Sequence, residues 1–239
     1  MNKIETHFII GSLELIVDFL KDSLSGYKNY IAKHIIRNLP DDFPWLISFP
    51  RTGSHWVRMA LEKYTNRPNL PRAFYSHPNN DYLLAHSHDN MLTLKKSNVI
   101  YLYRENPVDV VYSQISYHNQ SLKDSNIVHF WSNQYRAHLK HWLSEDHSRK
   151  KVLISYDKMI LSPLSEFSKL CAHLNLRIDA ELINKVFNSL SKNEVKQRTQ
   201  NDSKVVDLSS SYHEFRDAFE KDFKEVISNI VQLDTIIKS

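Results

Sequence analysis

Cysteine and glycine are scarce in this sequence of 239 residues, which contains one cysteine, Cys171, and three glycines. A single cysteine excludes an internal disulfide and a zinc site built from several cysteines, and it fits a reducing compartment. We therefore expect a cytoplasmic location. The chain has eight prolines and no Gly-Ser-rich or Pro-rich linker that would separate two domains. We predict one domain over residues 1–239.

Long runs of one charge and long apolar runs are also missing. The 31 basic and 27 acidic residues are well mixed and give a net charge of +4. Binding to nucleic acid is therefore not expected, whereas a polyanionic small ligand would suit a local basic pocket. Residues 8–24 have a helical apolar stripe, but Glu14, Asp18 and Lys21 interrupt the run. We predict neither a signal peptide nor a membrane span, and interpret residues 1–40 as a helical extension packed on the domain.

Short apolar runs alternate with helical patterns along the chain. The runs suited to buried strands are 45–49, 82–85, 99–103 and 152–155. The helical patterns are 54–64, 107–118, 127–143, 163–174 and 211–231. Asn106-Pro107 and Ser162-Pro163 are good helix starts, because a capping side chain precedes proline at the first helical position. This alternation predicts an α/β fold of three layers, with a central, mostly parallel sheet flanked by helices.

The first strand is followed by a segment suited to binding phosphate. Pro50 ends the strand, Gly53 allows a tight turn, and Arg51, Thr52 and Ser54 add hydrogen-bond donors at the start of a helix. The common nucleotide-triphosphate loop ends instead in Gly-Lys-Ser or Gly-Lys-Thr. An ordinary strand-turn-helix with a surface arginine is the alternative for this segment taken alone.

This segment resembles the 5′-phosphosulfate loop of sulfotransferases that use 3′-phosphoadenosine 5′-phosphosulfate (PAPS). The matching residues are Phe49, Pro50, Arg51, Thr52, Gly53, Ser54 and Trp56. The resemblance implies that residues 50–56 hold the 5′ end of PAPS and that Arg51 contacts the 5′-phosphate and the oxygen bridging to sulfur. His55 stands where the family often has a second threonine.

A second segment resembles the 3′-phosphate motif of the same family, in which a strand ends in arginine and a capped helix carries a serine. Arg104 and Ser113 match, and they are implied to bind the 3′-phosphate. Glu105 is an extra residue between the arginine and Asn106-Pro107. The resemblance spans roughly residues 45–175, since 152–157 is similar to a later strand of the family, and it implies that Tyr156 lies near the adenosine.

The catalytic base follows a strand between the two motifs in this family, usually within Lys-Thr/Ser-His. The corresponding place holds Leu84-Ala85-His86-Ser87-His88, which indicates His86 as the base, with His88 second. Because Leu84 replaces the family's lysine, stabilisation of the leaving group is expected to depend on Arg51. A metal site on His86, His88 and Asp89 is the less favoured interpretation, and we predict no metal.

Other parts of the site are less defined by the sequence. Four aromatic residues, Tyr75, His77, Tyr117 and His118, are candidates for the acceptor pocket, although such residues more often serve packing. His138 and His141 are interpreted as surface residues of a solvated helix. The family's C-terminal loop over the 3′-phosphate is not found; residues 196–211 have the polarity of a lid, with Arg198 or Lys204 as substitutes.

The sequence therefore predicts transfer of a sulfuryl group from PAPS to a hydroxyl or amine of a small-molecule or glycan acceptor, leaving 3′,5′-adenosine bisphosphate (PAP). Sulfuryl transfer is an in-line displacement, so a neutral histidine suits removal of the acceptor's proton. The alternatives are a nucleotide-dependent small-molecule kinase and a non-catalytic nucleotide-binding relative. The sequence leaves open whether the chain forms an oligomer.

Overall fold

The protein is described from a computed structural model, which covers residues 32, 34–77, 81–144, 148–199 and 211–238. Most of the predicted extension at 1–40 and most of the predicted lid at 196–211 lie outside these residues. Both stay predictions.

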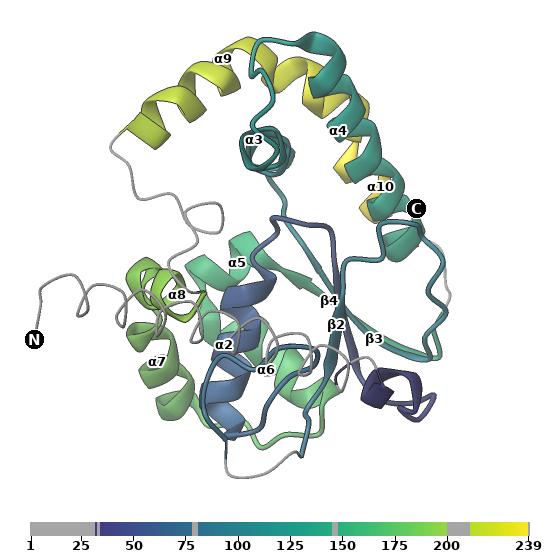
Figure 1. Cartoon of the computed structure of the whole chain (residues 1–239), viewed down its shortest axis with the longest axis vertical. Coiled ribbons are helices and arrows are strands. Elements are labelled where there is room, and N and C mark those ends of the chain that lie inside the picture. The colour runs from purple at the N-terminus through teal and green to yellow at the C-terminus, as the bar shows by residue number, and fades with distance from the viewer. Residues whose placement is uncertain (1–31, 33, 78–80, 145–147, 200–210, 239) are drawn as a thin grey trace, which may run out of the picture.

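The centre of the fold is a sheet of four parallel strands (Figure 1). They are β1 (Trp45–Ser48), β2 (Ala85–Ser87), β3 (Asn98–Tyr103) and β4 (Lys150–Ser155). Their order across the sheet is β2-β1-β3-β4, with Trp45 opposite Ala85 on one side and Val99 on the other. Every strand ends at the same edge, because all run in one direction.

The second strand lies three residues later than the predicted 82–85. Leu83 and Leu84 are buried, but their backbone bonds to the 68–70 segment and not to β1. The Leu83 N–H donates to Pro68 O, and the Leu84 carbonyl accepts from the Leu70 N–H, both at 2.9 Å. Pairing with β1 begins only at Ala85, which brings His86 into the strand and His88 just beyond its end.

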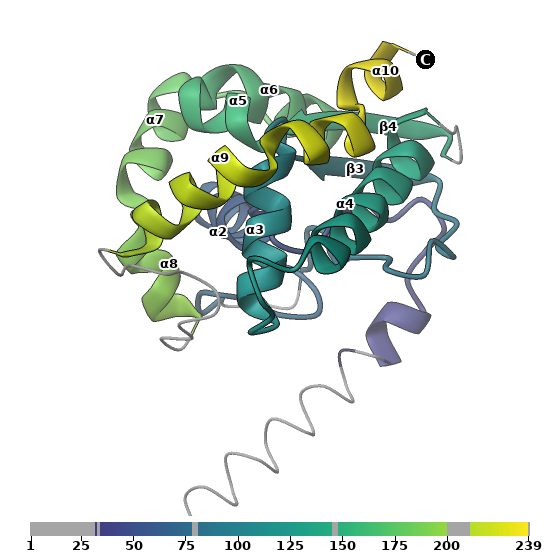
Figure 2. The same cartoon turned by 90° about the horizontal axis from the view of Figure 1, so that it is seen from above.

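Helices cover both faces of the sheet, as Figures 1 and 2 show. One face carries α3 (Pro107–Tyr117), α4 (Ser125–Leu139), α9 (Ser211–Val231) and α10 (Leu233–Lys238). The other carries α2 (Ser54–Thr65), α5 (Tyr156–Leu161), α6 (Pro163–His173), α7 (Ala180–Ser189) and α8 (Lys192–Arg198). The three-layer α/β prediction is confirmed.

Alternation along the strands explains the two cores. In β1, Trp45 and Ile47 pack against α3, α4 and α9, whereas Leu46 packs against the helices of the opposite face. Successive strand residues point to opposite faces, so a strand covered on both sides is apolar throughout. Ser48 and Ser155, the last residues of β1 and β4, are polar although they are buried.

Helix boundaries agree with the capping signals in part. Asn106 caps α3, with its Oδ1 accepting from the Val108 N–H at 3.1 Å. Helix α6 begins at Pro163 as predicted, although Ser162 forms no side-chain cap. The predicted helix at 127–143 is α4 followed by one π-helical stretch, η1 (Lys140–Ser144).

None of the helices in the described part of the chain combines the length and the apolar composition that a membrane crossing needs.

Candidate active site

A cavity of about 1350 Å³ lies where the parallel strands end. The segments after all four strands contribute side chains to it: Arg51 after β1, His88 after β2, Arg104 after β3 and Tyr156 after β4. Ligands of open parallel sheets bind at this edge. A drug-sized ligand usually fills a pocket of about 300–1000 Å³, so this cavity has room for two reactants side by side. Five basic and two acidic side chains are among its described lining residues.

The loop after β1 leads into helix α2, whose first backbone N–H groups have no capping side chain. Arg51 and Gly53 both have left-handed backbone angles, with φ of 69° and 90°. Gly53 is the N-cap of α2 and provides no capping side chain, so the first N–H groups of the helix are available to an anion. Thr52 is fully buried, and its hydroxyl donates to Phe49 O at 2.7 Å. Its side chain therefore fixes the loop, and the predicted hydroxyl contact with a phosphate does not fit this orientation.

Aromatic rings cover one side of the loop. The ring of Tyr156 lies directly over Gly53, where an added Cβ would stand 2.1 Å from the Tyr156 Cε2 atom. Trp56 packs edge-on against Tyr156, with ring centroids 5.6 Å apart, and its indole N–H donates to Leu190 O at 3.1 Å. A side chain at position 53 would therefore force the Tyr156 ring to move.

The two predicted anion sites meet in this cavity. Arg51 Nε donates to Ser113 Oγ at 2.9 Å, which links the loop after β1 to helix α3. Arg104 lies beside them and pairs with Asp109 at 2.7 Å and with Asp157 at 3.3 Å. The backbone of Arg104 is fixed by Tyr135, whose hydroxyl accepts from its N–H and donates to its carbonyl.

The extra residue at Glu105 is held without displacing Arg104 from the cavity. The Glu105 N–H donates to Asp157 Oδ2 at 2.5 Å, and its carboxylate pairs with Lys158 Nζ at 2.6 Å. Asp157 and Lys158 both belong to α5, which begins right after β4. The insertion is thus clamped to the next strand-helix connection.

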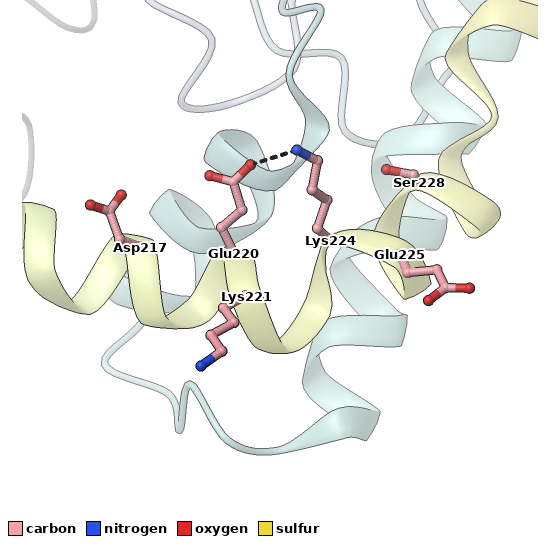
Figure 3. Close-up of a pocket in the computed structure, with 6 residues that line it drawn as sticks. All are labelled: Asp217, Glu220, Lys221, Lys224, Glu225 and Ser228. Carbon is pink, nitrogen blue, oxygen red and sulfur yellow. Dashed lines mark ion pairs between the residues drawn. The ribbon is translucent and has the colours of Figure 1, made fainter.

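Arg216 of α9 is a cavity residue that the sequence analysis missed. Its Nε donates to Asp109 Oδ1 at 2.8 Å, so Asp109 bridges the guanidinium groups of Arg104 and Arg216. Glu220 holds Arg216 from the other side and also pairs with Lys224 at 3.2 Å, as Figure 3 shows for the latter pair. A signal was present: Arg216 is the basic residue on the apolar stripe, four residues after Tyr212 and three before Phe219.

Of the two candidate bases, His88 lines the cavity, and His86 is not among the described lining residues. The Nδ1–H of His88 donates to the carbonyl oxygen of Ser48 at 2.8 Å, which leaves Nε2 as the unprotonated nitrogen. Burial, followed by the charges of Arg58 and Arg51, lowers the pKa of His88 below its ordinary value of 6.5. His86 has its Nε2 3.4 Å from Ser48 Oγ. The geometry favours His88 over the predicted first choice, His86.

His138 was expected at the surface, and the structure shows that this interpretation was wrong. It is buried and lines the cavity. Its Nε2–H donates to the carbonyl of His88, and its Nδ1 accepts from the hydroxyl of Tyr101, both at 2.8 Å. Burial lowers the pKa of His138 to about 3, so the ring is neutral. The sequence pattern led to the wrong position for His138 because polar residues of a helix usually face solvent, whereas His138 of α4 packs against Tyr101 of β3.

Several other candidates lie away from the cavity. Tyr75 and His77 are not among its described lining residues; His77 instead pairs with the buried Glu62 at 3.1 Å. Arg198 pairs with Glu194 and lies over the Tyr75 ring. Tyr117 and His118 do line the cavity. In the described ranges there is no cluster of three or more metal-binding side chains.

Comparison with known proteins identifies the family. The family model for the sulfotransferase domain matches residues 66–232, a range that contains His88, Arg104, Ser113 and Arg216. The chain belongs to the sulfotransferase family. This confirms the resemblance seen in the sequence and makes the protein a sulfotransferase. The predicted phosphate loop at 50–56 precedes the matched range.

Solved sulfotransferase structures share the fold. Mouse sulfotransferase SULT7A1, complexed with PAP, is similar with a TM-score of 0.60 and 16% identity, covering 84% of this chain and 87% of that one. Retinol dehydratase in a complex with retinol and PAP is similar with a TM-score of 0.54 and 15% identity, covering 81% of each chain. The search of curated proteins finds no match. At these identities the likeness supports the fold.

Proposed function

We propose that this sulfotransferase uses PAPS as its donor substrate and transfers the sulfuryl group to a hydroxyl or amine of a small-molecule or glycan acceptor. The observation that carries the proposal is the convergence of two anion-binding segments, since Arg51 after β1 and Ser113 of α3 are joined by a 2.9 Å hydrogen bond. A donor with phosphate at both its 5′ and 3′ positions needs two such sites close together. PAP is then the product.

The residues present fit this donor. The N–H groups of residues 52–55 and the Arg51 side chain would hold the 5′-phosphosulfate, while Arg104, Ser113 and Arg216 would hold the 3′-phosphate. In the structure, Arg104 and Arg216 share the carboxylate of Asp109. Each hydrogen bond that these guanidinium groups make to a charged partner contributes about 1.5–3 kcal/mol. Trp56 and Tyr156 provide flat rings for the adenosine between the two sites. Arg216 thereby provides a 3′-phosphate contact of the kind expected from the family's C-terminal loop, which is not recognisable in the sequence.

His88 is the base in this proposal, with His86 as the second candidate. The Nε2 of His88 takes the proton from the acceptor hydroxyl as the acceptor oxygen bonds to sulfur. The bond between sulfur and the bridging phosphate oxygen breaks, and Arg51 stabilises the negative charge that develops on that oxygen. The Ser48 carbonyl holds the Nδ1–H and so keeps Nε2 available. No step requires a metal ion.

The single cysteine, Cys171, is buried and free, which supports a cytoplasmic location as part of the same proposal. The net charge of +4 on well-mixed residues supports a small anionic ligand over nucleic acid.

Thermal unfolding with added nucleotides tests the donor assignment. At a ligand concentration of 100 times Kd, binding stabilises by about 2.7 kcal/mol, which is roughly 5–10 °C for a chain of this size. We expect PAP to raise Tm by this amount and ATP with Mg²⁺ to have little effect. Arg51→Ala should remove most of the shift, whereas Arg136→Ala, an exposed arginine of α4 outside the cavity, should retain it. Stabilisation by ATP-Mg²⁺ and not by PAP would favour a kinase.

A further inference from the structure

A row of aromatic side chains leads away from the reacting end of the cavity. The Arg51 guanidinium lies 5.2 Å from the centroid of the Tyr117 ring. The His118 ring is 5.1 Å from that of Tyr117 and stacks on Trp131 at 5.0 Å, with only 13° between the planes. Phe130 continues the row, 5.0 Å from Trp131. We call these four rings the aromatic row.

The aromatic row is exposed although it lines a cavity. Phe130 is 50% exposed and Tyr117 38% exposed. Two hydrogen bonds hold it in place: the backbone N–H of His118 donates to Gln114 O, and the indole N–H of Trp131 donates to Gln120 Oε1 at 2.8 Å. Neighbouring exposed aromatic rings that line a groove are typical of a ligand-binding surface.

The segments around the aromatic row also contribute amide side chains to the cavity. Three exposed amides, Asn90, Asn119 and Gln134, line the same cavity as the aromatic row. The segments 88–92, 116–119 and 130–138 contribute no Asp, Glu, Lys or Arg to its described lining. Of the charged lining residues, Arg104, Asp109 and Arg216 belong to the proposed 3′-phosphate site, and Arg51, whose guanidinium lies over the Tyr117 ring, belongs to the proposed 5′-phosphosulfate site. Arg72, Lys192 and Asp217 also line the cavity. This part of the cavity thus combines partly exposed aromatic rings with amide hydrogen-bonding groups.

We propose that the acceptor is a neutral glycan whose sugar rings stack on the aromatic row, with a hydroxyl group directed to His88; this rests on the proposed function. A compact apolar alcohol would need a pocket that encloses about 70–90% of its surface, and the exposed rings of Tyr117 and Phe130 do not enclose a ligand. A sugar ring has an apolar face for an aromatic side chain and a rim of hydroxyls for the amides. A chain of sugars also extends into solvent where the cavity opens.

NMR titration without donor tests this binding directly. The probes are neutral hexasaccharides of glucose, mannose or galactose, compared with a hydroxysteroid and 4-nitrophenol. We expect at least one hexasaccharide to shift the signals of the aromatic row and both other compounds to bind more weakly. Tighter binding of the steroid or the phenol would overturn the proposal, and so would the absence of binding by all hexasaccharides. PAP binding, measured on the same sample, separates this failure from failure of the donor assignment.

Two matched phenylalanine variants locate the effect. Phe130→Ala should weaken hexasaccharide binding about tenfold and leave the Kd for PAP unchanged, while Phe130→Trp should retain binding. Phe215→Ala is the control, because Phe215 is similarly exposed, at 56%, and is not among the described residues of the cavity. Equal losses in the two alanine variants, or no loss in Phe130→Ala, would contradict the assignment.

Discussion

Replacing Gly53 by alanine should destabilise the protein through two separate effects. With a φ of 90°, an L-residue at this position carries left-handed strain of about 1–2 kcal/mol. The new Cβ would also lie 2.1 Å from Cε2 and 2.3 Å from Cδ2 of Tyr156. Forcing such a contact usually costs about 1–3 kcal/mol. We expect Gly53→Ala to lower the free energy of unfolding by roughly 2–5 kcal/mol.

Removing the Tyr156 ring separates the two effects. In Gly53→Ala/Tyr156→Ala, alanine at 53 should carry only the backbone strain, so the double-mutant cycle should give a coupling of about 1–3 kcal/mol. Urea unfolding of the four proteins measures this, provided that the m-values agree. Tyr75→Ala in place of Tyr156→Ala is the control and should be additive within about 0.5 kcal/mol. Additive effects of Gly53→Ala and Tyr156→Ala would show that the Tyr156 ring does not restrict position 53.

Three further predictions concern the site. The lowered pKa of His88 keeps its base form available in mild acid, so the acid limb of the kcat/KM profile should lie below pH 6.5, and a limb above pH 6.5 would contradict this. Replacing the base in His88→Gln should lower kcat by about 10²–10⁴-fold. His138, with a folded pKa of about 3, takes up its proton only on unfolding between pH 6.5 and 3. It should therefore reduce stability by about 1.4 kcal/mol for each pH unit of acidification in that window, and His138→Gln should remove that part of the slope; an unchanged slope would exclude it. Arg216→Ala should weaken the binding of PAP about tenfold or more and leave the binding of adenosine 5′-monophosphate unchanged, as measured by calorimetry. Lys221→Ala of the same helix is the control. Equal losses of affinity for the two nucleotides would count against a contact between Arg216 and the 3′-phosphate.

Much of the fold could be predicted from the sequence because apolar runs and helix starts reflect local chemistry. The strands at 45–49, 99–103 and 152–155 were found within two residues at either end. The second strand was placed too early, because Leu83 and Leu84 are apolar and buried but their backbone groups bond to residues 68–70. An apolar pattern indicates that a segment is buried, but it does not indicate which segment its backbone bonds to.

The site was predictable where one segment carries it and less so where distant segments meet. Arg51 and Gly53 follow from the strand-to-helix turn, and Arg104 from the next strand end. The choice between His86 and His88 depends on the position at which β2 ends, which the sequence misjudged. The roles of Arg216 and His138 depend on packing against α3 and β3, over a hundred residues away for Arg216, and no local pattern specifies that.

A crystal structure with PAP bound would locate both phosphates relative to the proposed donor site. We expect the 5′-phosphate on the backbone N–H groups of residues 52–55 and the 3′-phosphate within hydrogen-bond distance of Arg104, Ser113 and Arg216, with Asp109 no longer bridging the two arginines as it does now. We also expect open space between the 5′-phosphate and His88 for the acceptor. PAP bound with its 3′-phosphate away from Arg104, or outside this cavity, would rule out the donor assignment.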